Sequence, residues 1–156
     1  FATEFSHFQD ALITWQWPGR FQKLNYKADV ILDGAHNPHA LTALMDTLST
    51  EHNAPLHVVF SAIHTKDAAQ MIETLKQRAH SVHLCPSSVG KSINQESLQT
   101  LCPELPNYAS ADLALDEACT LALQDNGQVL VTGSLFLVAD ILHLITGENR
   151  DPGVVG

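Results

Sequence analysis

The stretch "VILDGAHNPHALTAL" (30–44) carries residue types that could bind an anion. A run of aliphatic residues ends at Asp33, and Gly34, His36 and Pro38 precede an apolar helical pattern. A helix that begins here presents free N–H groups and a partial positive charge, which favour a phosphate or a carboxylate. Asp33 could accept hydrogen bonds from a ribose or an amine, and His36 could donate to phosphoryl oxygens. Spacing alone leaves open a simpler interpretation, in which Asp33 caps the turn and His36 packs beside it.

Local rules fix how this stretch should fold. Gly34 permits a turn with positive φ or the close approach of a ligand. Pro38 suits the first turn of a helix, and Asn37 is the predicted N-cap. We therefore expect the carboxylate and the imidazole to flank the start of a helix.

Arg20 is the first arginine of the chain and lies in "WPGRFQ" (17–22), at the start of the preceding predicted strand. A guanidinium can form paired hydrogen bonds with phosphate oxygens. The alternative is an ordinary surface arginine.

Two further turns follow predicted strands. In "FSAIHTKDAA" (60–69), Lys66 could face an anionic ligand, or the segment could simply start a helix at Asp67. In "VTGSLFLVAD" (131–140), backbone N–H groups and the Ser134 hydroxyl could hold a carboxylate, or Ser134 could serve only as an N-cap.

Short apolar runs alternate with helical patterns along the chain. Strands are predicted at 21–24, 29–33, 56–62, 81–85, 107–110 and 127–134. Helices are predicted at 39–51, 67–79, 94–101, 112–125 with Asp112 as N-cap, and 135–145. This alternation favours an α/β domain with a mostly parallel sheet and helices on both faces. Ligands bind at the carboxyl ends of such strands, which directs attention to the loops after Leu32, Phe60, Leu84 and Val131.

Composition excludes several classes of function. The 156 residues suit one domain, and the net charge of −9 argues against nucleic acid or an anionic membrane as a partner. The few cations therefore become informative, and the candidates are Arg20, Lys23, Lys27, Lys66 and Lys91. We find no apolar run long enough for a transmembrane helix and no signal peptide.

Known cofactor motifs are missing from the sequence. The spacing of Cys85, Cys102 and Cys119 matches no metal or redox motif, so we expect buried or incidental thiols in a reducing cytoplasm. There is no HExxH and no Cys/His cluster, so no protein-bound metal is expected in this domain. The chain also lacks GxGxxG and the Walker A pattern.

Taken in order, "WPGRFQ", "ILDGAHNPHA", "TKD" and "VTGSLFLVADIL" resemble the C-terminal domain of the folylpolyglutamate synthase/dihydrofolate synthase family, within the Mur ligase superfamily. The resemblance runs from about residue 15 to residue 146. It implies a Rossmann-like three-layer domain with about six strands. It also implies a ligase that uses ATP to phosphorylate a carboxylate of folate or dihydropteroate. The amine of L-glutamate then attacks the acyl phosphate to give an amide, ADP and phosphate.

The resemblance also implies roles for individual residues. In the family, the arginine of "PGRF" and the aspartate of "DGAHNP" contact ATP, which implies nucleotide binding by Arg20 and Asp33. The histidine of the same motif lies near the nucleotide phosphates, so His36 is the catalytic candidate. Ser134 matches a turn that lies near the incoming amino acid in related Mur ligases. Lys66 is a second substrate candidate, in a loop that departs from the family's usual glycine-rich form.

The family's P-loop, magnesium ligands and modified lysine lie in other domains, so this chain is expected to be a fragment. Residues 1–16 are expected to be a linker or helix from a missing N-terminal ATP-binding domain, 17–148 the Mur ligase C-terminal domain, and 149–156 a tail. The missing P-loop domain would be the main partner and would hold most of the ATP and Mg²⁺. The whole protein is expected to be cytoplasmic and monomeric, and this fragment alone to be inactive.

Other functions share some of these features. A Mur-type ligase of cell-wall synthesis or a cyanophycin-type synthetase has the same C-terminal domain, although "DGAHNP" favours the folate branch. A non-catalytic ligand-binding module is the alternative from a different functional class.

Overall fold

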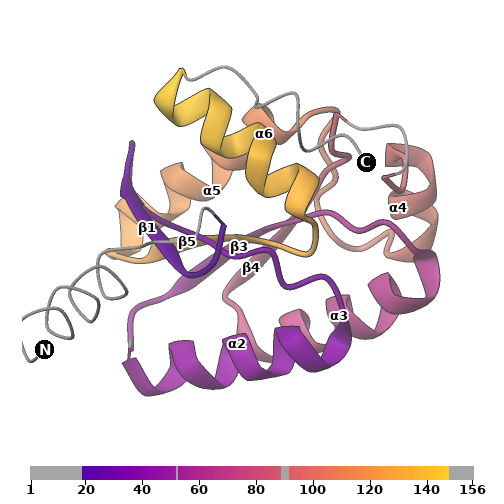
Figure 1. Cartoon of the computed structure of the whole chain (residues 1–156), viewed down its shortest axis with the longest axis horizontal. Helices are drawn as coiled ribbons and strands as arrows, with labels where there is room; N and C mark the ends of the chain where they lie inside the picture. The colour runs from indigo at the N-terminus through magenta and orange to yellow at the C-terminus, as the bar shows by residue number, and fades with distance from the viewer. Residues whose placement is uncertain (1–18, 52, 89–91, 148–156) are drawn as a thin grey trace, which may run out of the picture.

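The computed structural model describes residues 19–51, 53–88 and 92–147, and the predicted linker 1–16 and tail 149–156 lie outside these ranges. The described residues form one five-stranded sheet in the order β1-β2-β5-β3-β4 (Figure 1). The parallel strands are β2 (Asp29–Leu32), β5 (Gln128–Thr132), β3 (Leu56–Phe60) and β4 (Ser81–Leu84). The edge strand β1 (Gln22–Asn25) pairs antiparallel with β2. The mostly parallel sheet predicted from the sequence is confirmed.

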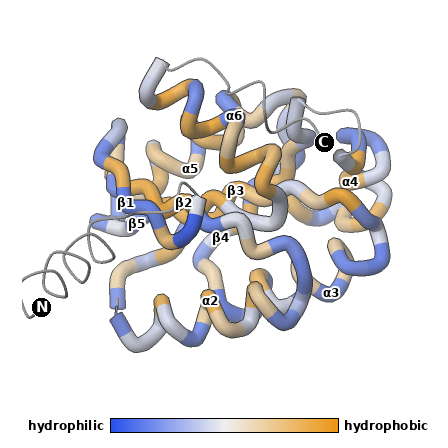
Figure 2. Tube along the Cα trace, in the orientation of Figure 1, coloured by the Kyte–Doolittle hydropathy of each residue, from blue (hydrophilic) through white to orange (hydrophobic). Residues whose placement is uncertain are grey.

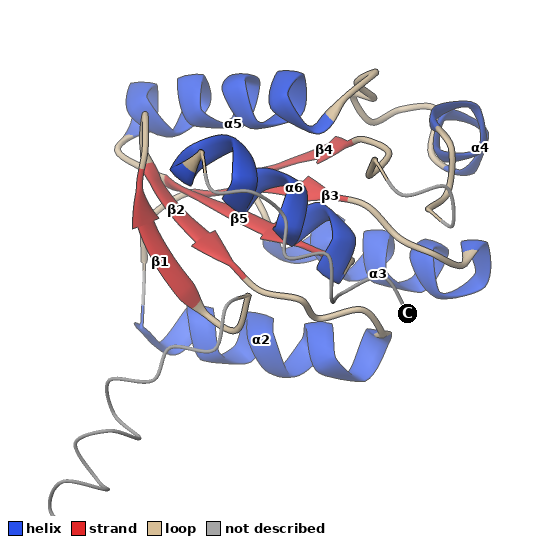
Figure 3. Cartoon of the chain, turned by 45° about the horizontal axis from the view of Figure 1, so that its top comes forward, coloured by secondary structure: helices blue, strands red, loops and turns tan. Residues whose placement is uncertain are grey.

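Helices cover both faces of the sheet, as predicted (Figures 1 and 3). One face carries α2 (Pro38–Glu51) and α3 (Thr65–Arg78), with α4 (Gln95–Leu101) packed beside α3. The other face carries α5 (Ala111–Asp125) and α6 (Leu135–Thr146). The result is a three-layer α/β domain.

Successive residues of the strands supply two separate cores because side chains alternate across a sheet. Ile31 and Leu130 pack with α2 and α3, whereas Val30, Val129 and Val131 pack with α5 and α6. Every residue of β3 and β5 is buried. Figure 2 shows hydrophobic residues along the strands and hydrophilic residues on outer turns of α2 and α3. Burial on both faces explains why these strands read as continuous apolar runs.

Helix starts agree with the sequence rules except at α3 and α5. α3 begins at Thr65, with His64 as N-cap, rather than at the predicted Asp67. α2 begins at Pro38, and the Asn37 side chain accepts a hydrogen bond from the Ala40 N–H at 2.8 Å, as predicted. The prediction of Asp112 as the N-cap of α5 is wrong, because Ser110 occupies that position and Asp112 lies in the first turn. A hydrogen bond from Ser110 lowers the pKa of the Asp112 carboxyl.

The predicted strand 107–110 is reduced to a single bridge between Asn107 and Leu84. The chain turns directly afterwards into α5, whose N-cap is Ser110, so no room remains for a ladder. All three cysteines are free and buried, and burial raises the pKa of Cys85 to about 12. No helix in the described part of the chain is long and apolar enough to cross a membrane.

Candidate functional site

Three loops meet at the carboxyl edge of the sheet. The turn before β1 lies beside the loop after β2, because antiparallel pairing places Gln22 opposite Leu32. The loop after β2 is joined to β5 by the Asp33 N–H, which donates to the Val131 carbonyl at 3.0 Å. β2 continues into α2 on one face of the sheet and β5 continues into α6 on the other, so the two segments diverge at the carboxyl ends of these neighbouring strands. Such a divergence is where ligands bind in open α/β sheets.

Asp33 connects two of these loops through its carboxylate. One oxygen, Oδ2, accepts from the Phe21 N–H at 3.0 Å, and the other, Oδ1, accepts from the Ala35 N–H at 2.9 Å. The Gly34 N–H donates to the Gly19 carbonyl at 2.7 Å and strengthens the same connection. The capping role considered for Asp33 is therefore present. Its contact with ATP remains a prediction.

Close packing at this junction requires two glycines. A Cβ on Gly34 would lie 2.2 Å from Cδ2 of Leu135. Gly133 has a φ of +96°, and a Cβ there would lie 2.2 Å from the Ser61 carbonyl oxygen. The Gly133 N–H donates to the Ala35 carbonyl at 2.9 Å, so the loops after β2 and β5 are joined through their backbones. Backbone contacts thus set the relative positions of Asp33 and Ser134.

Arg20 and His36 are both exposed at this junction. The His36 Nδ1 lies 3.0 Å from the Gly34 carbonyl oxygen, which can only accept a hydrogen bond. Nδ1 must therefore carry the proton, and Nε2 of a neutral ring is an acceptor. His36 could donate from Nε2 to a phosphoryl oxygen only as an imidazolium.

The first turn of α2 offers fewer free donors than its sequence implied. Pro38 has no N–H, the Asn37 side chain takes the Ala40 N–H, and the Leu41 N–H donates to the Asn37 carbonyl. Of these first four helical positions, the N–H of His39 remains as a donor for a ligand. Side chains, rather than helix amides, must supply most of any anion binding here.

Ser134 is fully buried, and its Oγ accepts from the Phe136 N–H at 3.1 Å. The N-cap interpretation of Ser134 is confirmed, and its contact with a substrate remains a prediction. Lys66 is exposed in the first turn of α3, which follows β3 on the far side of β5 from β2. It lies at the same edge of the sheet as the other candidates, and its substrate role is likewise untested.

The remaining cations differ in position. Lys23 lies 3.9 Å from Glu51. Lys27 lies in the turn between β1 and β2, at the end of the strands opposite the candidate site. Its hydrogen bond to Asp116 raises its pKa. Lys91 lies outside the described residues. Among the cations of the described residues, Arg20 and Lys66 are therefore the best placed to contact an anionic ligand.

A cavity of about 300 Å³ lies near the same edge, between the loop after β4, the start of α5, and α6. Two carboxylates, Asp112 and Asp140, line it. Both Asp140 oxygens accept from Ser88, through its N–H and its hydroxyl, at 2.7 Å each. These negative charges oppose a phosphate, so the cavity is no alternative to the Arg20 junction for an anion.

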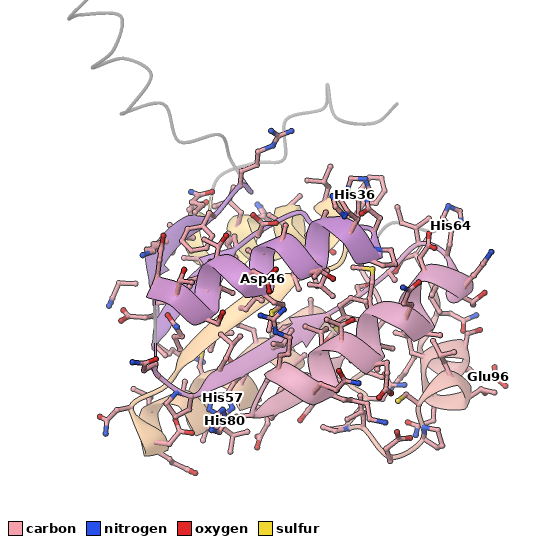
Figure 4. All side chains as sticks on the ribbon, turned by 90° about the horizontal axis from the view of Figure 1, so that it is seen from below. His36, Asp46, His57, His64, His80 and Glu96 are labelled. Atoms are coloured by element: carbon pink, nitrogen blue, oxygen red, sulfur yellow. The ribbon has the colours of Figure 1, made fainter. Side chains whose placement is uncertain are left out.

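The sequence interpretation overlooked His64, which is the exposed N-cap residue of α3. Figure 4 shows His64 and His36 near the same edge of the molecule, away from His57 and His80. The sequence indicated His64 as a candidate through "HTKD", a polar run directly after a predicted strand. Among the described residues, no group of three or more histidine, cysteine or acidic side chains could hold a metal ion.

The fold is shared with solved ligase structures. The structure of E. coli FolC in complex with DHPP and ADP has a TM-score of 0.75 and 27% identity, with coverage of 91% of this chain and 34% of that one. Bifunctional folylpolyglutamate synthase/dihydrofolate synthase from Yersinia pestis, complexed with AMPPNP and Mn ion, has a TM-score of 0.71 and 25% identity, over 84% and 32%.

The amino-acid sequence has relatives with related names. A probable bifunctional folylpolyglutamate synthase/dihydropteroate synthase of Haloferax volcanii is 35% identical over 80% of this chain and 15% of its own length. Dihydrofolate synthase/folylpolyglutamate synthase of Bacillus subtilis is 29% identical over 85% and 31%. The chain spans only 15% to 38% of the first three curated relatives it matches. Residues 19–135 match the Mur ligase, glutamate ligase domain. The chain therefore belongs to the Mur ligase glutamate ligase domain family.

Proposed function

We propose that this chain is the C-terminal domain of a cytoplasmic, ATP-dependent ligase that joins L-glutamate to folate or dihydropteroate. The observation that carries the proposal is the junction of Arg20, Asp33 and His36 at the divergence of β2 and β5, in a chain that matches a glutamate ligase domain. The relatives' names favour the folate branch over cell-wall ligases. One solved neighbour was determined with Mn, AMPPNP and L-glutamate bound, at 25% identity.

The proposed reaction has two steps. A substrate carboxylate oxygen attacks the γ-phosphorus of ATP, the bond to the bridging oxygen breaks, and ADP leaves. The deprotonated amine of glutamate then attacks the acyl carbon, and phosphate leaves with the former carboxylate oxygen as an amide forms. Negative charge develops on phosphoryl oxygens in the first step, so positioned cations accelerate it.

The residues of this chain would take complementary parts in these steps. Arg20 is exposed and would place a permanent positive charge beside the phosphoryl oxygens. His36 would donate from Nε2 in its imidazolium form, because Nδ1 is held by the Gly34 carbonyl. Lys66 and the turn at Ser134 would face the carboxylates of glutamate. These assignments rest on position and charge.

The rest of the whole protein would complete the site. The described residues contain no acidic or histidine cluster that fits a metal ion, so Mg²⁺ would be held by the P-loop domain, where it would neutralise phosphate charge. ATP would then lie between the two domains. One wall of such a site cannot supply both the P-loop amides and Arg20, so residues 1–156 alone are expected to be inactive.

Comparing the isolated chain with the full-length protein tests this division of labour. Each is supplied with ATP, Mg²⁺, labelled L-glutamate and either dihydropteroate or folate, and label in the pterin product is counted. Full-length protein should form product only when ATP is present, and residues 1–156 should form none. Turnover by residues 1–156 would refute the two-domain site, and an inactive, folded full-length protein would refute the substrate assignment.

A further inference from the structure

The turn that carries Arg20 is held by a side chain from the loop after β2. Phe21, directly after Arg20, has a φ of +47°. Residues other than glycine avoid this left-handed region because the Cβ crowds the following carbonyl oxygen. The Phe21 N–H donates to Oδ2 of Asp33 at 3.0 Å, and the Phe21 side chain packs against the core. The carboxylate thus stabilises a backbone conformation that phenylalanine adopts rarely.

The second oxygen of the same carboxylate holds the neighbouring loop. Oδ1 of Asp33 accepts from the Ala35 N–H at 2.9 Å, and the Ala35 carbonyl accepts from the Gly133 N–H at 2.9 Å. Hydrogen bonds from amides to a charged acceptor are stronger than those to a neutral one. Asp33 therefore links the turn before β1 to the loop after β2, and through it to β5.

Charge favours this use of Asp33 over direct phosphate contact. A carboxylate that faces phosphate oxygens is repelled by them, whereas one that accepts from two main-chain N–H groups is stabilised. Each oxygen retains a lone pair, so it could also accept a hydrogen bond from a ligand hydroxyl.

We propose that Asp33 is a positioning residue. Its carboxylate holds the Arg20 turn in place by accepting from the Phe21 and Ala35 N–H groups, an arrangement called the latch below, so that the guanidinium points towards the nucleotide. This inference rests on the proposed function, because the phosphate contact of Arg20 belongs to it. Without the latch, Phe21 relaxes to a negative φ and Arg20 loses its fixed place. Small displacements of positioning groups are costly for catalysis, so Asp33→Ala should lower kcat by about tenfold to a hundredfold.

The latch itself is tested without any assay of function. Hydrogen exchange, resolved to single amides in the full-length protein, is measured for Phe21 and Ala35. Both amides should exchange faster in Asp33→Ala. The matched control is Asp29→Ala, at the other end of β2, where an exposed carboxylate accepts from the Asn25 side chain at 3.2 Å. Unchanged protection of the Phe21 amide in Asp33→Ala would overturn the latch.

A second variant tests whether the loss of kcat in Asp33→Ala arises from the backbone at Phe21. Glycine at position 21 adopts a left-handed φ freely, so the double variant Asp33→Ala, Phe21→Gly should recover much of the kcat that Asp33→Ala loses, relative to Phe21→Gly alone. Should Asp33→Ala fail to fold, Asp33→Asn replaces it. The asparagine keeps one acceptor oxygen, so it should release one of the two amides and lower kcat less.

The outcomes separate the two claims. Loss of kcat in Asp33→Ala with recovery in the double variant supports positioning through the backbone. Loss without recovery means that Asp33 acts on the nucleotide directly, and an unchanged kcat in Asp33→Ala means that the latch does not aim Arg20. An unchanged kcat in Arg20→Ala refutes the phosphate contact of the proposed function, while the exchange measurement still decides whether the latch exists.

Discussion

Replacing Gly133 with alanine is expected to destabilise the protein strongly, because two separate effects add at this position. The φ of +96° places an alanine in a backbone region that costs roughly 1–2 kcal/mol. The new Cβ would also lie 2.2 Å from the Ser61 carbonyl oxygen and 2.4 Å from Cε2 of Phe60. Relief requires the backbone to move by about 1 Å, and overpacking of this kind costs about 1–3 kcal/mol. The expected loss of unfolding free energy is therefore about 2–5 kcal/mol.

The matched control is Gly147→Ala. Gly147 also has a positive φ, of +69°, but a Cβ there would meet nothing within 4 Å. Only the backbone effect remains, and the expected loss is roughly 1–2 kcal/mol. Urea unfolding followed by circular dichroism measures both variants against the parent. If Gly133→Ala is no less stable than Gly147→Ala, the close contact between the loops after β5 and β3 is not as described.

Three further predictions concern single side chains. Burial lowers the pKa of His83 to about 4 from 6.5. As the pH falls, the unfolded chain therefore takes up a proton before the folded one does. The free energy of unfolding should be highest above pH 6.5 and should fall by up to about 3 kcal/mol towards pH 4. His83→Gln should flatten this part of the pH–stability curve, and an unaltered curve would contradict the assignment. Ser134→Ala removes the α6 cap and should cost about 1 kcal/mol in thermal unfolding, whereas an unchanged Tm would mean that the cap contributes nothing. Lys66→Ala should raise KM for glutamate in the full-length enzyme, whereas Lys76→Ala, at the other end of α3 and paired with Glu104, should not. Equal KM values for those two variants would remove Lys66 from the site.

Local sequence rules predicted most of the framework because its signals are local. Strands β3 and β5 are largely apolar runs buried on both faces, and the start of α2 follows from Asn37 and Pro38. The error at α5 arose because Ser110 and Asp112 are both common N-cap residues, and only the path of the chain decides between them.

The geometry of the candidate site was less predictable because it depends on contacts between distant segments. Nothing in the sequence marks Phe21 for a left-handed φ, since phenylalanine seldom adopts one. The hydrogen bond from the Phe21 N–H to the Asp33 carboxylate requires antiparallel pairing of β1 with β2, which no local pattern reports. The hydrogen bond from the Ala35 N–H is local to the turn, as the capping interpretation implied. The resemblance to a ligase family implies that Arg20 and Asp33 lie near a nucleotide, and we propose from the fold that Asp33 positions Arg20.

We propose that this domain contributes Arg20 to phosphoryl transfer in an ATP-dependent glutamate ligase. The most direct test is the steady-state kinetics of Arg20→Ala in the full-length protein, with Lys27→Ala at the opposite edge of the sheet as the control. Arg20→Ala should lower kcat by about a hundredfold, a larger factor than any rise in KM for the folate substrate, while Lys27→Ala should behave like the parent. An unchanged kcat for Arg20→Ala would mean that Arg20 takes no part in phosphoryl transfer.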